Sequence, residues 1–325
     1  MANPEHLARI EQGSDVWNRW RRTYPEINPN LREADLSHAA LSHMDLSNAD
    51  LCMANLEGAN LHKASLRKAN LYTANLSYVN LREATLNQVD LREATLRQAD
   101  LCMATVRESD LSRADLREVN LYTASMKGVK FRESDLSRAD LREANLSMAN
   151  MREANLREAN LGLAILSMVN LVGANLYRSR LNLANLSLAN LCMASLMGAD
   201  LREATLIGAN LIGVNLYTAN LREAILQEAD LREATLSQVD VSYANLSMAN
   251  LSMANLRDAK FYRANLEGAN LHRANLHGST LEGAYLRDTI MPDGRVQHMS
   301  GLNGNSPETM NSAHVSLEPV HNPER

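Results

Sequence analysis

Histidine, cysteine and acidic side chains are the groups in this 325-residue chain that could bind a metal or act in catalysis. Five of the nine histidines lie in the region from residue 31 to residue 286, near its two ends: His38, His43, His62, His272 and His277. A metal site needs ligands that converge on one point, and no Cys–His pair is spaced as a nucleophile with its base. We therefore expect no metal site, no cofactor and no catalytic residue.

The acidic side chains occur mostly beside arginine, in repeated Leu-Arg-Glu-Ala units. Such neighbours are more typical of a solvated, charge-paired surface than of a catalytic pair. The sequence also has no glycine-rich phosphate loop and no insertion that could wall a pocket. We expect that the protein is not an enzyme.

The three cysteines, Cys52, Cys102 and Cys192, each follow a leucine in a Leu-Cys-Met-Ala context. Three are too few for a disulfide framework, and we expect all of them at outward-facing positions, unpaired. The first residues do not read as a signal peptide, and no apolar run is long enough to cross a bilayer. These features favour a cytoplasmic protein that does not bind membranes.

The backbone structure that positions these groups is determined by a repeat of five residues. From Leu31 to Leu286 every fifth residue is large and apolar, and 46 of these 52 positions are Leu. A small residue, mostly Ala, lies two places before each, so the unit reads Ala-(Asp/Asn)-Leu-x-x. Five residues advance about 500° on an α-helix, and an odd spacing alternates faces on a strand, so either element would leave many leucines in water. A chain that turns a corner every five residues buries all of them in stacked coils.

The repeat resembles the A(D/N)LXX repeat of the pentapeptide-repeat family, over about four-fifths of the chain. The resemblance implies an all-β solenoid: a right-handed quadrilateral β-helix with four pentapeptides per coil and about 13 coils, over residues 31–291. Residues 1–30 are expected to form a helical cap and connector, and they resemble the N-terminal region of cyanobacterial members. Residues 292–325 are expected to form a turn and then a disordered tail.

Caps and turns follow from local signals. Asn3 before Pro4 predicts a helix start, and an apolar stripe with both tryptophans predicts one or two short helices over about 4–22 that cover the first coil. The alternative is an amphipathic helix that binds a partner or a membrane. Nine glycines lie two places after the large apolar residue, where a type II turn needs positive φ. Coils with Glu, Met or Thr there are expected to use other turns.

Charge balance bears on the kind of partner. Some members of the family imitate duplex DNA and bind type II topoisomerases such as gyrase, which requires a strongly acidic surface. Duplex DNA carries one charge per ~1.7 Å, whereas this chain has 38 acidic and 33 basic residues and a net charge of −5. DNA mimicry is therefore the disfavoured alternative, and a gyrase supercoiling assay would detect it. The same balance argues against direct nucleic-acid binding.

One wall of the predicted coil carries outward apolar residues and little charge. We interpret it as a candidate protein-docking stripe; the alternative is that these side chains only shield neighbouring coils. The stripe comprises Met148, Ile165, Met168, Leu188, Ile207, Ile225 and Met248. The leading hypothesis is a non-enzymatic protein–protein interaction rod with a regulatory role, an unknown protein partner, and a monomeric or weakly end-to-end dimeric state.

Overall fold

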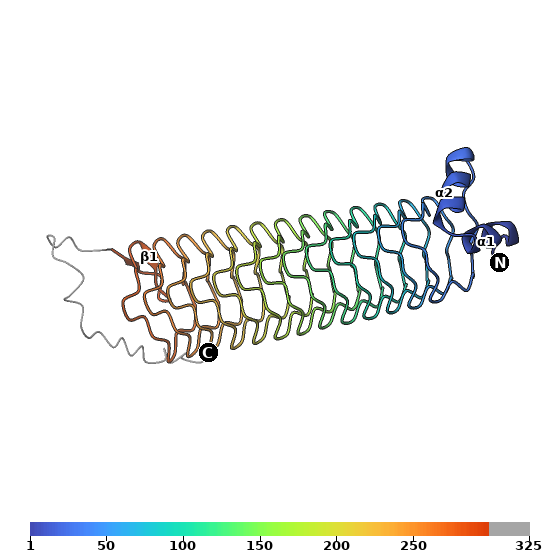
Figure 1. Ribbon diagram of the computed structural model, residues 1–325. Helices are drawn as coiled ribbons and strands as arrows, with labels where there is room; N and C mark the ends of the chain where they lie inside the picture. Colours follow the sequence, from blue (N-terminus) through green and yellow to red (C-terminus); the bar gives the residue numbers. More distant parts are fainter. Residues whose placement is uncertain (299–325) are drawn as a thin grey trace, which may run out of the picture. The chain divides into compact units, whose positions relative to one another are not determined.

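The computed structural model describes residues 1–298, so the predicted disordered tail lies mostly outside the described residues. The chain divides into two compact units, Met1–Asn175 and Leu176–Arg325. The first unit begins with helices α1 (Pro4–Glu11) and α2 (Ser14–Thr23), and the second contains the short strands β1 (Thr289–Ile290) and β2 (Val296–Gln297) (Figure 1). Within residues 1–298, no helix is long and apolar enough to span a membrane.

The rest of each unit consists of stacked coils (Figure 1). In the first unit Asn55 forms a parallel bridge with Asn75, and Asn75 forms one with Thr95; in the second, Asn190 pairs with Asn210 in the same way. The two partners of each bridge thus lie four pentapeptides apart in the sequence, so four pentapeptides complete one coil. Each pentapeptide makes one side of a four-sided coil, as the resemblance to the pentapeptide-repeat family implied.

The core of each unit is the interior of the coils. Almost every apolar residue at the fifth positions is fully buried, and the small residue two places earlier is buried beside it. Phe131 and Phe261 take the place of Leu at two positions without becoming exposed. Each buried leucine contributes about 1.5–3 kcal/mol relative to an exposed one. Because each coil buries the same kinds of residue, every coil is stabilised in the same way.

The polar residue before each leucine completes the hydrogen bonding of the backbone. Pentapeptide 71–75 shows the pattern: three N–H groups bond to neighbouring coils, one closes the corner, and the fifth donates to a side chain on the preceding pentapeptide. The five bonds are Leu71 N to Asp90 O (2.7 Å), Thr73 N to Arg92 O (3.0 Å), Asn75 N to Ala54 O (3.0 Å), Ala74 N to Leu71 O (3.0 Å) and Tyr72 N to Asn70 Oδ1 (3.2 Å). Asn and Asp recur before the leucine because their short oxygen reaches the one amide that the coils leave unpaired.

The expectation of different turns for Glu, Met and Thr was wrong. Every described pentapeptide corner has the left-handed conformation, with φ of +52° to +61° at the non-glycine residues, including Glu93, Met53 and Thr73. A left-handed φ costs a residue with a side chain about 1 kcal/mol. The corner accepts that cost because its N–H must point along the stack, as Thr73 N does toward Arg92 O at 3.0 Å. Glycine removes the strain but is not required.

Helix α2 covers the exposed edge of the first coil with side chains that act in place of a preceding coil. Trp17 is fully buried. The contacts with the edge are Trp17 Nε1 to Asp45 O (2.8 Å), Asn18 Nδ2 to His43 O (2.9 Å), Asp45 N to Asn18 Oδ1 (2.8 Å) and Arg21 to Ser47 O (2.9 Å). The backbone groups of the coil that would otherwise face water are thus paired, which is what a solenoid end needs.

Helix α1 covers the same end of the coils by hydrogen bonding to Asn30. Asn3 caps the helix by accepting from Glu5 N at 2.8 Å, and Asn3 N donates to Asn30 O at 3.0 Å. The buried His6 accepts the N–H of Asn30 on Nδ1 at 3.0 Å. Burial lowers the pKa of His6 below its usual value, which favours the neutral ring that can accept this bond.

At the C-terminal end of the described residues, Met291-Pro-Asp-Gly makes the turn between β1 and β2. The two strands pair antiparallel, with Ile290 opposite Val296. Unlike the first coil, this last coil is covered only in part by described residues, since Leu281 and Leu286 are half-buried.

Candidate functional site

The outward walls are the surfaces on which functional side chains can lie, because the interior of the coils is filled. In the first unit the structure brings Met148, Ile165 and Met168 together on adjacent coils: Met148 N donates to Ser167 O at 3.0 Å, and the Ser167 and Ser147 hydroxyls are 3.3 Å apart. The three apolar side chains are 41–53% exposed. No charged residue lies among the outward positions of this wall on these two coils.

In the second unit the predicted stripe residues are equally outward but less continuous. Leu188 N donates to Ile207 O at 2.9 Å, so these two lie on adjacent coils, and Ile225 lies on the next coil. Glu228 then interrupts the apolar surface before Met248. Leu188 and Met248 are more than 60% exposed, which makes them the most accessible members of the stripe.

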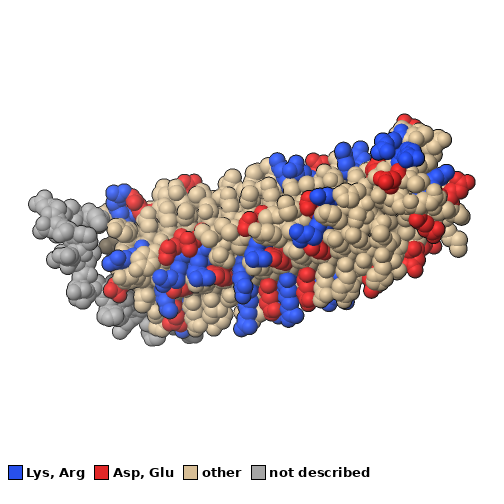
Figure 2. All heavy atoms as spheres, in the orientation of Figure 1, with Lys and Arg blue, Asp and Glu red and all other residues tan. Residues whose placement is uncertain are grey.

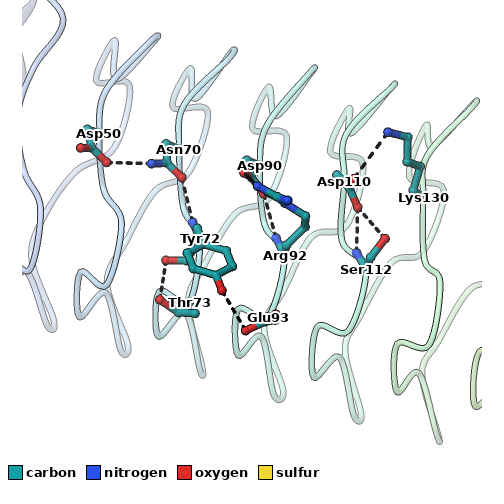
Figure 3. A network of polar contacts seen from close by, with 10 residues as sticks. All are labelled: Asp50, Asn70, Tyr72, Thr73, Asp90, Arg92, Glu93, Asp110, Ser112 and Lys130. Carbon is teal, nitrogen blue, oxygen red and sulfur yellow. Dashed lines mark hydrogen bonds and ion pairs between the residues drawn. The ribbon is translucent and has the colours of Figure 1, made fainter.

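A second surface was not singled out from the sequence: a polar network on the wall of the first unit that carries Tyr72 (Figure 3). Tyr72 donates its hydroxyl to Glu93 Oε2 at 3.1 Å, and the Arg92 guanidinium lies 5.5 Å from the centre of the Tyr72 ring. Arg92 also donates two hydrogen bonds to Asp90, at 2.8 and 2.6 Å. A shallow depression beside these residues is lined by Tyr72, Arg92, Glu93, Ser112, Arg113, Arg132 and Glu133.

Hydrogen bonds within this network shift the pKa values of Tyr72 and Asp90 away from neutral pH. The hydrogen bond to Glu93 raises the pKa of Tyr72, so the phenol stays protonated and is a poor nucleophile. The two hydrogen bonds from Arg92 lower the pKa of Asp90, so this carboxylate stays ionised and is a poor general base near neutral pH. The arrangement can bind a partner through hydrogen bonds and ring contacts, and neither Tyr72 nor Asp90 is poised for acid–base chemistry.

The three cysteines occupy the outward place just after the leucine, but two of them are shielded from solvent there. Cys52 and Cys102 are buried, and Cys192 is half-buried; all three are free thiols. The next residue in the same stacked position after Cys52 is Tyr72, and after Cys102 it is Tyr122, so a small side chain lies beside a large one. A short side chain on a wall can therefore be covered by its neighbour on the next coil.

The histidines of the repeat region point outward and do not converge on a metal site. His43 and His62 are the nearest pair, with ring centres 5.8 Å apart in an edge-to-face arrangement. Within residues 1–298, no group of three or more His, Cys, Asp or Glu side chains could hold a metal ion.

Charges of both signs are interleaved on the visible face (Figure 2). Many form pairs along a wall or between adjacent coils, such as Arg113 with Glu133 at 3.0 Å and Lys63 with Glu83 at 3.3 Å. The partners are 38–63% exposed, so each pair contributes little to stability. In these pairs the charges of opposite sign balance each other locally.

Comparison with known proteins places these features in a family. A family model described as "Pentapeptide repeats (8 copies)" matches residues 30–132, 134–252 and 254–291 in overlapping segments. HetL, a pentapeptide-repeat protein involved in heterocyst differentiation regulation in the cyanobacterium Nostoc, is 37% identical over 65% of this chain and 92% of its own, with a TM-score of 0.45. Rfr23 from the cyanobacterium Cyanothece is 40% identical over 30% of this chain and 63% of its own, with a TM-score of 0.26.

A more distant similarity is to QnrB1, a plasmid-mediated fluoroquinolone resistance protein: 18% identity over 57% of this chain and 90% of that protein, with a TM-score of 0.34. A search of curated protein sequences finds no significant match. The family model covers most of the chain, and its repeats coincide with the sides of the coils. The chain therefore belongs to the pentapeptide-repeat family and has its fold, a right-handed quadrilateral β-helix.

Proposed function

We propose that this protein is a non-enzymatic scaffold that binds another protein through the outward walls of its coils. The observation that carries the proposal is the stripe in the first unit, where Met148, Ile165 and Met168 are 41–53% exposed on two adjacent coils whose outward positions on this wall carry no charge. Methionine is common at adaptable protein-binding surfaces because its side chain is flexible and polarizable. A surface of this kind fits a partner that presents apolar side chains of its own.

The described residues offer little support for an enzyme. The depression beside Tyr72 is shallow, and the protonation states around it are held by Glu93 and Arg92 in the forms least suited to proton transfer. We further propose a cytoplasmic location, where the unpaired thiols of Cys52, Cys102 and Cys192 would remain reduced.

Affinity capture followed by reconstitution tests the proposal. The wild-type chain and two double variants, Met148→Glu with Met168→Glu and Leu188→Glu with Met248→Glu, are used to capture proteins from the native host. A protein recovered with the wild type is then purified and its dissociation constant measured with each form. Adding two charges to an apolar contact should weaken binding at least tenfold in one or both variants.

A matched control introduces the same charges at exposed apolar residues on other walls: Tyr78→Glu with Met253→Glu, at residues that are 59% and 54% exposed. This control should bind as the wild type does. Equal affinity for all four forms would refute the assignment of the stripe. Turnover of a small molecule by the purified chain would refute the non-enzymatic role.

A further inference from the structure

Two opposite walls of the first unit carry the same residues. We name them the Tyr72 wall and the Tyr122 wall; each comprises four pentapeptides on four successive coils. The matching segments are Asn-Leu-Arg-Glu-Ala at 30–34 and 80–84, Asp-Leu-Cys-Met-Ala at 50–54 and 100–104, Asn-Leu-Tyr-Thr-Ala at 70–74 and 120–124, and Asp-Leu-Arg-Glu-Ala at 90–94 and 140–144. All twenty positions are identical between the two walls.

The offset between the matching segments, ten pentapeptides, determines where the two walls lie. Bridged residues are four pentapeptides apart, so the offset corresponds to two and a half coils. The half coil places the second wall on the opposite side of the stack, and the offset along the stack is about 12 Å at ~4.8 Å per coil. A partner bound to one wall therefore leaves the other accessible.

Duplication of a stretch of chain does not account for this identity. A copied stretch would carry adjacent walls together, as the twelve residues 107–118 do when they recur unbroken at 132–143, because they span three consecutive pentapeptides. Between residues 35 and 88, the nine pentapeptides outside the Tyr72 wall have 27 outward positions. Only three of these match the residue ten pentapeptides later: Arg67, Arg82 and Glu83. The same residues have been kept on one wall while the adjacent walls differ, which points to a requirement on the wall surface.

The two walls also have the same conformation. The Tyr122 hydroxyl donates to Glu143 at 3.1 Å, as that of Tyr72 does to Glu93. Arg142 lies 5.3 Å from the centre of the Tyr122 ring and donates two bonds to Asp140, at 2.8 and 2.6 Å. Other contacts repeat between the walls: Asn70 with Asp50 and Asn120 with Asp100, both at 2.9 Å, and Thr73 with Tyr72 O and Thr123 with Tyr122 O, at 2.7 and 2.8 Å.

Each wall has an apolar centre between two acidic corners. On the Tyr72 wall the exposed Met53 and the ring of Tyr72 lie between Glu33 and Glu93, three coils apart. The two arginines of the wall are paired with its two aspartates, at 3.8 Å for Arg32 and 2.6 Å for Arg92. The glutamates are therefore the unbalanced charge, and each wall has a net charge of −2.

Of the four corner glutamates, Glu93 and Glu143 accept a hydrogen bond from a tyrosine of their own wall, and the other two have only weak ionic partners. Glu33 lies 3.7 Å from the terminal amine of Met1, and on the other wall Glu83 lies 3.3 Å from Lys63. These pairs are well exposed, and such pairs are worth less than about 1 kcal/mol. A partner that brings two cations to the corners can displace them.

The spacing matches an extended chain. Three coils separate the corner glutamates by roughly 14 Å. In an extended strand, residues i and i+4 face the same way at about 13–14 Å, with residue i+2 between them on the same face. A segment with basic residues at i and i+4 and an apolar residue at i+2 would place its cations near Glu33 and Glu93 and its apolar side chain near Met53.

We propose that the Tyr72 and Tyr122 walls are two equivalent docking sites, each for an extended basic–x–apolar–x–basic segment of a protein partner. One chain thus holds two copies of that partner on opposite sides. Each site covers only four coils of one wall, far less than the ~800 Å² per side of a stable interface, so each binds weakly and paired engagement supplies avidity. This inference rests on the proposed function and gives it a partner chemistry and a stoichiometry.

Photo-crosslinking to the purified full chain tests the inference. The probe is an acetylated, amidated peptide with the core Lys-Thr-Xaa-Thr-Lys, in which Xaa is p-benzoylphenylalanine, and the crosslinked residues are mapped by mass spectrometry. Labelling is expected at both walls, to within threefold of each other. It should fall at least tenfold when the two lysines of the probe are replaced by glutamate, or when one lysine is moved by a single position.

Charge reversal separates the two sites. Glu33→Lys with Glu93→Lys should abolish labelling of the Tyr72 wall only, and Glu83→Lys with Glu143→Lys that of the Tyr122 wall only. Glu118→Lys with Glu158→Lys, which changes the net charge equally on a different wall, should leave both sites labelled. Circular dichroism verifies that every variant is folded.

Absence of labelling at the walls, labelling of one wall only, or labelling that the charge reversals do not redirect would each overturn the inference. Because the probe is synthetic and the chain is pure, such a result leaves the capture experiment on the Met148 stripe unaffected. Loss of the stripe assignment would likewise not change the labelling pattern.

Discussion

Replacement of Trp17 tests how the first coil is stabilised. The indole is fully buried between α2 and the coil edge, 5.0 Å from the ring of Trp20, and its N–H donates to Asp45 O at 2.8 Å. Trp17→Ala removes roughly 200 Å² of buried surface, which corresponds to about 5 kcal/mol at 25 cal/mol per Å². Measured losses for buried Trp→Ala changes are about 3–5 kcal/mol, and we expect a loss in that range.

Trp17→Phe separates the hydrogen bond from the packing. Most of the apolar area remains, and the Asp45 carbonyl loses its donor, so the expected loss is about 1–2 kcal/mol. Tyr78→Ala, at a residue that is 59% exposed, should change stability by less than about 0.5 kcal/mol.

Urea unfolding gives the magnitudes, and hydrogen–deuterium exchange gives the location. Because the coils of a solenoid interact mainly with their neighbours, Trp17→Ala should accelerate amide exchange in residues 31–50 far more than in residues 100–150. An equal loss of stability for the Ala and Phe variants, or a uniform increase in exchange along the first unit, would refute the reasoning that α2 stands in for a missing coil.

Two further predictions concern the corners and the surface ion pairs. Gly128→Ala should lower the stability only by the left-handed strain of about 1 kcal/mol, since the nearest atom to the new methyl group would be 3.9 Å away. Gly58→Ala should lower it more, because its methyl group would lie 2.5 Å from the His38 ring. A larger loss of melting temperature for Gly128→Ala than for Gly58→Ala would contradict this. Because Arg92 lowers the pKa of Asp90 below its usual 3.8, the pair stabilises the fold above that pH and loses its contribution as the pH falls through the lowered value. The stability difference between wild type and Arg92→Gln in urea should therefore be positive at pH 7 and shrink below pH 3.8, and a difference that grows in acid would contradict the sign.

The sequence was sufficient to predict the coils because one spacing determines so much of the backbone. Leucine at every fifth position has a single geometry that buries all copies, and Asn3 with Pro4 marks the first helix correctly. The conformation of the corners was mispredicted because the φ preference of a residue type reflects only its local backbone and not its bonds to the next coil. Glu93 and Thr73 are poor choices for positive φ in isolation, but the ladder bond of each corner N–H overrides that preference.

The burial of wall residues also could not be predicted from the order of residues along the chain. Whether Cys52 is covered depends on Tyr72, which is four pentapeptides away in the sequence but adjacent in the stack. The identity of residues on the Tyr72 and Tyr122 walls was missed for the same reason. The signal is present in the sequence, but it becomes visible only when pentapeptides one full coil apart are compared as one surface, and the offset between the two walls is not a whole number of coils.

The central claim is that every pentapeptide forms one side of a coil with the same backbone hydrogen bonds to the neighbouring coils, so that outward side chains distinguish one surface from another. Residue-resolved amide exchange across residues 51–150 tests this most directly. The account predicts a period of five. Exchange should be slow at the leucine, at the corner residue two places later and at the residue before the leucine, and faster at the residue just after the leucine, whose N–H makes no backbone bond to a neighbouring coil. A period near 3.6, or protection without any period, would contradict it.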